Sequence, residues 1–150
     1  MNFVAAMILA VCKGNEDEAL TIFTSLMEDT AFGDYFHRET NFEALHNDTK
    51  KLEVRLVETD IQLAQHLHSV GFELTSITPT WLLTCFFLPI GPSKALDVLD
   101  VVIHSGSSAR EYLIEYALDV LLHHRGAILR CEDIDEIFLV FKKPICQNNI

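Results

Sequence analysis

The sequence predicts an all-α fold, a helical bundle formed by a single chain of 150 residues. Apolar residues recur at helical spacing along nearly the whole chain. No stretch shows the sustained alternation, bounded by hairpin turns, that is typical of strands. A hydrophobic share of 49%, with only 4 prolines and 6 glycines, is typical of a chain that buries a core. We therefore treat the chain as one unit.

The first two helices are predicted from an apolar run and a cap. Residues 1–11 predict a buried helix, ended by Lys13 and Gly14, and Asn15 is a suitable N-cap for the next one. We expect this second helix to carry the apolar residues Ala19, Leu20, Ile22, Phe23, Leu26 and Met27. A loop with a short aromatic turn follows at Phe32, Tyr35 and Phe36.

A longer helix is predicted from Asn41 onward, and it has two distinct faces. The stripe expected to face the core consists of Phe42, Leu45, Thr49, Leu52 and Leu56. The polar face, expected to be solvated, carries Lys50, Lys51, Glu53 and Arg55.

Caps and breakers divide the second half of the chain. Residues 59–62 have the form of a capping box, with Thr59 as N-cap and Gln62 reaching back, and the helix that follows ends at Gly71. A helix from about Pro79 is apolar on all sides over residues 81–87, which places it in the middle of the bundle. Residues 91–93 break the chain before another apolar helix at 94–104, which Gly106 closes.

Two further helices complete the prediction. Residues 108–111 repeat the form of a capping box and open a helix whose expected inward residues are Leu113, Tyr116, Ala117, Val120 and Leu121. The last helix is amphipathic, is ended by Pro144, and carries Ile134, Ile137, Phe138 and Phe141. The final six residues are expected to be frayed.

Composition excludes several classes of function. There are 22 acidic against 11 basic residues, a net charge of -11, and the basic residues are scattered, so we expect no nucleic-acid partner. The acidic clusters at residues 16–18 and 132–136 are interpreted as helix starts, where negative charge complements the helix dipole. The four cysteines, Cys12, Cys85, Cys131 and Cys146, are interpreted as reduced thiols, with Cys12 and Cys85 buried in apolar runs. No histidine has a recognised metal-ligand spacing, so we expect no metal and no cofactor.

Residues 3–12 form an apolar run that could also be the core of a signal peptide. The run lacks a basic segment before it, so a buried helix is the preferred interpretation over secretion or lipidation. This run and residues 81–90 are both far shorter than the roughly 20 residues that span a bilayer. We therefore expect a soluble protein without a transmembrane segment.

An ordered series of motifs runs through residues 60–106. In order, these are His66-Leu67, Gly71-Phe72, Trp81-Leu82-Leu83-Thr84-Cys85-Phe86, Asp100 and Gly106. This series resembles the second half of a TBC domain, the all-helical domain of Rab GTPase-activating proteins. Met1-Asn2-Phe3, Glu18-Ala19 and residues 23–28 extend the resemblance, which covers residues 1–125 as a partial TBC domain. Residues 126–150 are then a C-terminal helix and frayed tail packing on it.

The sequence departs from the family pattern at two places. Leu99-Asp100 stands where the family usually has Trp-Asp, and Ile90-Gly91 replaces Leu-Pro. The first exchange keeps a core position apolar, although it leaves volume to be refilled. Both departures weaken identity more than fold.

The resemblance assigns structural roles to four signature residues, His66, Trp81, Asp100 and Gly106. We expect Trp81 in the core, and Asp100 as a buried hydrogen-bonding residue whose partner is a neighbouring helix end or His104. His66 is expected to act in a similar way. The helix at residues 1–11 is expected to expose an apolar face that would favour self-association.

The family's catalytic residues are absent from the sequence. Its arginine finger lies in an I-x-x-D-x-x-R motif and its glutamine finger in Tyr-x-Gln-Gly, and residues 1–150 contain neither. No residue matches the context of either finger among Arg38, Arg55, Arg110, Arg125, Arg130, Gln62 and Gln65. We therefore assign no catalytic residue, and expect a chain that is not an enzyme and does not accelerate GTP hydrolysis.

Three interpretations remain open at this point. The chain is a piece of a Rab-activating protein, linked to GTPase activation in vesicle traffic; or a TBC relic without fingers that binds a GTPase; or a helical adaptor or scaffold whose likeness to the family is accidental. The first two imply a Rab-type small GTPase as partner. They also imply a cytoplasmic location, peripheral to endomembranes.

Overall fold

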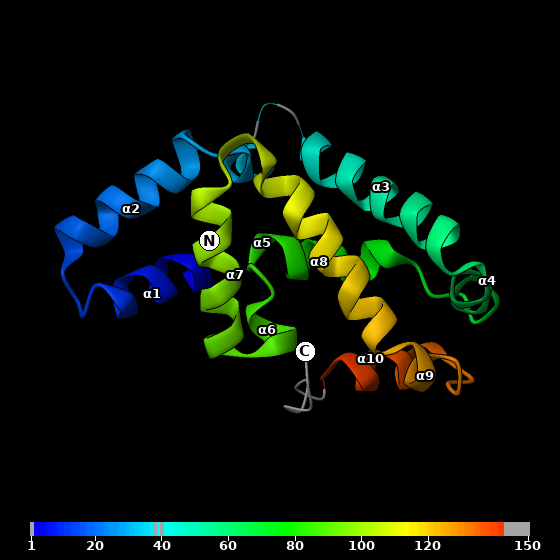
Figure 1. The fold of residues 1–150 in the computed structure, drawn as a ribbon. Helices are drawn as coiled ribbons and strands as arrows, with labels where there is room; N and C mark the ends of the chain where they lie inside the picture. The colour runs from blue at the N-terminus through cyan, green and yellow to red at the C-terminus, as the bar shows by residue number, and fades with distance from the viewer. Residues whose placement is uncertain (1, 38, 40, 143–150) are drawn as a thin grey trace.

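The computed structural model describes residues 2–37, 39 and 41–142, and within these residues it contains helices and no strand (Figure 1). The α-helices are α1 (Asn2–Val11), α2 (Glu16–Glu28), α3 (Glu43–Thr59), α4 (Ile61–Ser69), α5 (Thr78–Leu83), α6 (Phe87–Ile90), α7 (Pro92–His104), α8 (Ala109–His123), α9 (Arg125–Ile128) and α10 (Ile134–Lys142). The 3-10 helices are η1 (Ala31–Phe36), η3 (Leu74–Ser76) and η4 (Gly106–Ser108). The predicted all-α fold class is confirmed.

Helix α8 is the centre of the bundle. It packs against α3, α7 and α5, while α1 and α2 form a hairpin beside α7 and α4 lies at the far end of α3 (Figure 1). Its predicted inward residues are confirmed: Leu113, Ala117, Val120 and Leu121 are buried and Tyr116 is half-buried. Contacts between elements far apart in sequence therefore hold the fold together.

Helix α1 is buried on one face only. Val4, Met7 and Ile8 are buried, whereas Leu9 and Val11 are 39% and 59% exposed, so the expectation of a buried helix holds for one face of α1. The exposed apolar face that we expected here is present. In the next helix Leu20 is 64% exposed, whereas Ala19 and Leu26 are buried.

Two predicted features at the start of the chain are confirmed. Lys13 and Gly14 both have positive φ angles after α1, and the Asn15 side chain accepts a hydrogen bond of 3.3 Å from the Glu18 N–H. The acidic residues of 16–18 occupy the first turn of α2. This helix start therefore follows the local signals.

Two other helix starts differ from prediction, and a third lies where we expected it but lacks its side-chain cap. Helix α3 begins at Glu43, since Phe42 has a left-handed φ of 60° and is largely exposed. Asp60, not Thr59, caps α4, because its carboxylate accepts a 3.0 Å hydrogen bond from the Leu63 N–H. Ser108 makes no side-chain cap.

The apolar segment predicted as one helix over residues 81–87 is divided into α5 and α6. Cys85 and Phe86 have φ angles of 47° and 63°, and the Phe86 N–H donates to the Trp81 carbonyl at 2.8 Å. This turn interrupts the helix while keeping Cys85 and Phe86 fully buried. Helix α7 then begins at Pro92, where a missing N–H costs no helical hydrogen bond.

The described residues include three of the four cysteines. Cys12, Cys85 and Cys131 are free and buried, as predicted, and burial raises the pKa of Cys85 to about 12. Cys146, Pro144 and the final six residues lie outside the described range. No cluster of metal-ligating side chains occurs in the described part of the chain. None of its helices combines the length and apolarity needed to cross a bilayer.

Candidate partner-binding surface

The four signature residues lie on separate elements and do not form one site. Trp81, on α5, is 2% exposed, and its ring meets that of Phe141 edge-on at 5.0 Å. His66, on α4, is half-buried, and its Nε2 atom has no hydrogen-bond partner among the described residues. Gly106 follows α7 with a φ of 52°, a left-handed conformation that favours glycine. The positions of Trp81 and Gly106 are compatible with structural roles, whereas the buried Nε2 atom of His66 does not make the hydrogen bond that we expected.

Asp100 is not buried, which corrects the expectation for this residue. Its side chain is 75% exposed, because it points away from the buried face of α7 formed by Val98, Leu99 and Val102. The predicted partner is nevertheless present: His104 Nδ1 lies 3.6 Å from the Asp100 carboxylate and 2.7 Å from its carbonyl oxygen. Water therefore competes for this contact.

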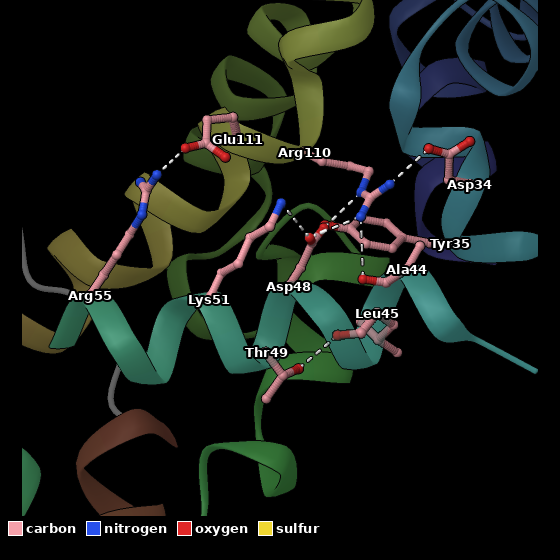
Figure 2. Close-up of polar contacts among 10 residues, drawn as sticks. All are labelled: Asp34, Tyr35, Ala44, Leu45, Asp48, Thr49, Lys51, Arg55, Arg110 and Glu111. Carbon is pink, nitrogen blue, oxygen red and sulfur yellow. Dashed lines mark hydrogen bonds and ion pairs between the residues drawn. The ribbon is translucent and has the colours of Figure 1, made fainter. Parts of the chain in front are cut away.

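A buried polar cluster that the sequence analysis missed joins η1, α3 and α8 (Figure 2). We call it the Arg110 cluster: Asp34, Tyr35, Asp48, Lys51 and Arg110. Arg110 binds Asp48 through two parallel hydrogen bonds, from Nε at 2.7 Å and from Nη2 at 2.9 Å. The Tyr35 hydroxyl donates a third bond, of 2.8 Å, to the same carboxylate.

The outer members of the cluster use the remaining donors of the arginine. Arg110 Nη1 donates to the Asp34 carboxylate at 2.8 Å, and Nη2 also lies 3.4 Å from the Ala44 carbonyl oxygen. Lys51 Nζ approaches Asp48 at 3.4 Å from the solvent side. The guanidinium also lies over the Tyr35 ring, 5.5 Å from its centre. The arginine is therefore held from several sides.

The charges in the cluster are fixed by these contacts. Burial alone would raise the pKa of Asp48, but the hydrogen bonds from Arg110 and Tyr35, together with the charges of Arg110 and Lys51, outweigh it and lower that pKa. Burial, together with the Asp48 charge, raises the pKa of Tyr35, so the phenol stays protonated and donates. Asp48 is therefore held as a carboxylate, and Tyr35 as a neutral phenol that donates a hydrogen bond to it.

A signal for this cluster was present in the sequence. Asp48 follows Leu45 by three residues and precedes Leu52 by four, so it lies on the apolar stripe of α3. A carboxylate at a core position needs a cationic partner, and that partner is Arg110, 62 residues away. The sequence alone does not say which arginine approaches.

The expected solvated face of α3 is instead partly engaged with α8. Arg55 of α3 forms ion pairs with Glu111 and Glu115 of α8 at the surface of the protein. A shallow hollow of about 760 Å³ lies beside these pairs. Lys50, Val54 and Glu58 also line the hollow. This face of α3 and α8 is open and carries both acidic and basic side chains.

Arg125 is also engaged, at the start of α4. Its Nε atom bonds the Asp60 carboxylate, and Nη2 lies 2.6 Å from the Gln62 side-chain oxygen. The capping-box role predicted for Gln62 is therefore wrong, because its side chain contacts an arginine of α9. Asp60 combines a helix cap with an ion pair.

The comparisons with known proteins agree with this all-helical architecture. The model of the family described as Rab-GTPase-TBC domain matches residues 1–129. The chain is 27% identical to TBC1 domain family member 2A of Rattus norvegicus over 151 aligned residues, which cover 99% of this chain and 16% of the relative. It is 30% identical to TBC1 domain family member 30 of Homo sapiens, over 91% of this chain and 16% of the relative.

The same family member from Mus musculus is also 30% identical, over 91% of this chain and 19% of the relative. The chain thus spans less than a fifth of the length of these curated relatives. No solved structure matches it significantly. The family match covers well over half of the chain, and the chain belongs to the Rab-GTPase-TBC domain family.

Proposed function

We propose that this chain forms the C-terminal part of a Rab-activating TBC domain that contacts a Rab-type small GTPase, and that residues 1–150 alone do not accelerate GTP hydrolysis. The family membership supports the first part, and it removes the alternative of an accidental resemblance. The finger motifs missing from the sequence support the second. Vesicle traffic, at a cytoplasmic site peripheral to endomembranes, is the proposed setting.

The state of Arg110 is the structural observation that carries the proposed inactivity. An activating protein supplies an arginine to the transferred phosphoryl group, and such a residue needs free N–H donors. Those of Arg110 are used by Asp48, Asp34 and the Ala44 carbonyl. Releasing it would leave Asp48 buried without its partner, at a cost of about 3–5 kcal/mol.

The other described arginines offer no better candidate. Arg55 and Arg125 are paired with carboxylates at the surface. Arg130 is exposed, but it lies one residue beyond the matched region of the family. None of the three lies in the sequence context of an arginine finger.

The proposed domain division is residues 1–125 for the TBC part and 126–150 for a helix and tail packed on it. Contacts of α10 support this packing: the Phe138 ring lies 5.4 Å from Phe72, and the Phe141 ring lies 5.0 Å from Trp81. These rings fasten the last helix to the signature segment.

The alternative function is a finger-less GTPase-binding or adaptor module. The exposed apolar side chains of α1, Phe3, Leu9 and Val11, favour it, because such a face buries area against a partner. A second copy of the chain could serve as that partner. Size-exclusion chromatography at rising concentration would reveal such self-association.

The deciding experiment is single-turnover GTP hydrolysis across a panel of Rab-type GTPases, with the chain in excess. We expect rates equal to the intrinsic ones, because an arginine finger is worth about 10³–10⁵ in rate. A clear stimulation of any panel member would contradict the proposed inactivity. Binding to the same GTPases, loaded with a non-hydrolysable GTP analogue, is measured in parallel. If the chain binds none of these GTPases, the adaptor function is favoured.

A further inference from the structure

An apolar groove lies where α3, α4 and η3 meet, away from the Arg110 cluster. Its volume is about 660 Å³. The floor consists of Leu56, Leu67, Phe72 and Leu74, each of which is buried. A hollow of this size receives several apolar side chains of a partner.

An exposed apolar stripe leads along α3 into this groove. Val54 and Val57, which lie three residues apart on α3, are 57% and 49% exposed, and Ile61, the first residue of α4, is 58% exposed. Val57 and Ile61 line the groove itself. Val54 lies one helical turn before Val57 on the same helix, so its exposed side chain extends the apolar surface of the groove along α3.

The charged groups at the groove are acidic. Glu53 lines it from α3 and Glu73 from the residue before η3, and neither makes an ion pair within the described residues. No lysine or arginine is among its lining residues, and His68 is the remaining titratable group. The groove therefore attracts cationic groups.

These three observations fit one kind of occupant. We propose that the groove docks an amphipathic helical segment of another protein, with apolar anchors on one face and lysines or arginines beside them. The anchors enter between Leu56 and Phe72, and the basic groups reach Glu53 and Glu73. At this groove, repulsion by Glu53 and Glu73 disfavours an anionic membrane and an acidic segment of a second copy of this chain.

The experiment measures binding of a labelled synthetic helical peptide, with leucines at i, i+3 and i+7 and lysines at both ends, to the full chain by fluorescence anisotropy. We expect saturable binding. Glu53→Lys/Glu73→Lys should weaken it about tenfold or more, because two attractive contacts become repulsive. Ile61→Ser should weaken it by a similar factor, because an exposed anchor contact is lost.

Matched variants separate the groove from general acidity. Glu28→Lys/Asp119→Lys changes the net charge equally at exposed residues outside the groove lining, and Leu20→Ser removes an exposed leucine from α2. Both should bind the peptide within about twofold of the wild type. Equal losses in the two charge variants, or no loss in Ile61→Ser, would overturn the proposal. Tighter binding to phosphatidylserine vesicles than to the peptide, or dimerisation abolished by Ile61→Ser, would overturn it in favour of a membrane or a second copy.

Discussion

Helices α3 and α8 are joined by arginine–carboxylate pairs at two places that differ in burial. In the first, Arg110 of α8 and Asp48 of α3 have side chains that are 21% and 0% exposed. In the second, the polarity is reversed: Arg55 of α3 is 30% exposed, and its partners Glu111 and Glu115 of α8 are 48% and 55% exposed. The same chemistry on the same two helices therefore operates in two environments.

The comparison shows that an ion pair stabilises the fold strongly only where water cannot hydrate the carboxylate after its arginine is removed. If its arginine is removed, Glu111 is hydrated by water at little cost. Asp48 is 0% exposed and cannot be hydrated in this way, so without Arg110 it would retain only the Tyr35 hydroxyl and the more distant Lys51 ammonium. Breaking the buried pair should therefore destabilise the fold far more than breaking the exposed one.

Asp48→Ala is expected to have the largest effect. It leaves the guanidinium of Arg110 and the hydroxyl of Tyr35 without their main acceptor, so we expect a loss of about 3–5 kcal/mol in the free energy of unfolding. Urea unfolding followed by circular dichroism measures this loss. A loss below about 1 kcal/mol, the value typical of an exposed pair, would contradict the proposed burial effect.

A double variant distinguishes the effect of losing the ion pair from the effect of leaving Arg110 without its partner. Asp48→Leu/Arg110→Met replaces both charges by apolar side chains of similar size, which in other buried pairs is neutral or stabilising. We expect this variant to be more stable than Asp48→Ala. If it is equally unstable, the loss arises from altered packing and not from an unpaired charge.

The Asp60 cap should give an intermediate effect. Asp60→Ala removes the acceptor of the Leu63 N–H and the partner of Arg125, so we expect a loss of about 1 kcal/mol. Thr59→Ala, at the residue that the sequence suggested as cap, is the matched control and should change stability by less than about 0.5 kcal/mol. Equal losses in the two variants would contradict the observed cap.

The pH dependence sharpens this prediction. The backbone hydrogen bond from Leu63 and the contact with Arg125 lower the pKa of Asp60 in the folded chain. A depressed pKa contributes stability above the unfolded value of about 3.9, and this contribution is lost as the pH falls towards the folded value. The difference between wild type and Asp60→Ala should therefore shrink at acidic pH.

Local signals in the sequence predicted most helices but not the long-range pairs. Apolar spacing located α2, α3, α7 and α8, and Asn15 marked the start of α2. Thr59 and Ser108 have the right chemistry for caps, but Asp60 offers a better acceptor beside the first, and the chain at the second continues from a 3-10 turn. Such competition between neighbouring residues is decided by backbone geometry.

The Arg110 cluster was harder to predict than the helices, because the residues that pair in it are distant in sequence. Asp48 could be recognised as a carboxylate on an apolar stripe, but the choice of Arg110 follows from how α3 crosses α8. Asp100 shows the opposite error, since a polar residue in an apolar helix proved to face solvent. Only the tertiary arrangement distinguishes the two cases.

Glu111→Gln should have the smallest effect and completes the comparison. It removes one of the two carboxylates beside Arg55, and Glu115 remains to pair with the guanidinium, so we expect a loss of about 0.5 kcal/mol or less. Because the pair is exposed, this loss should vanish at high salt, whereas that of Asp48→Ala should persist. Urea unfolding at low and at molar sodium chloride measures both. Salt screens charges only where water and ions reach them. A loss for Glu111→Gln that persists at high salt would therefore mean that the Arg55 pairs are as shielded from solvent as the Arg110–Asp48 pair, which would contradict the comparison.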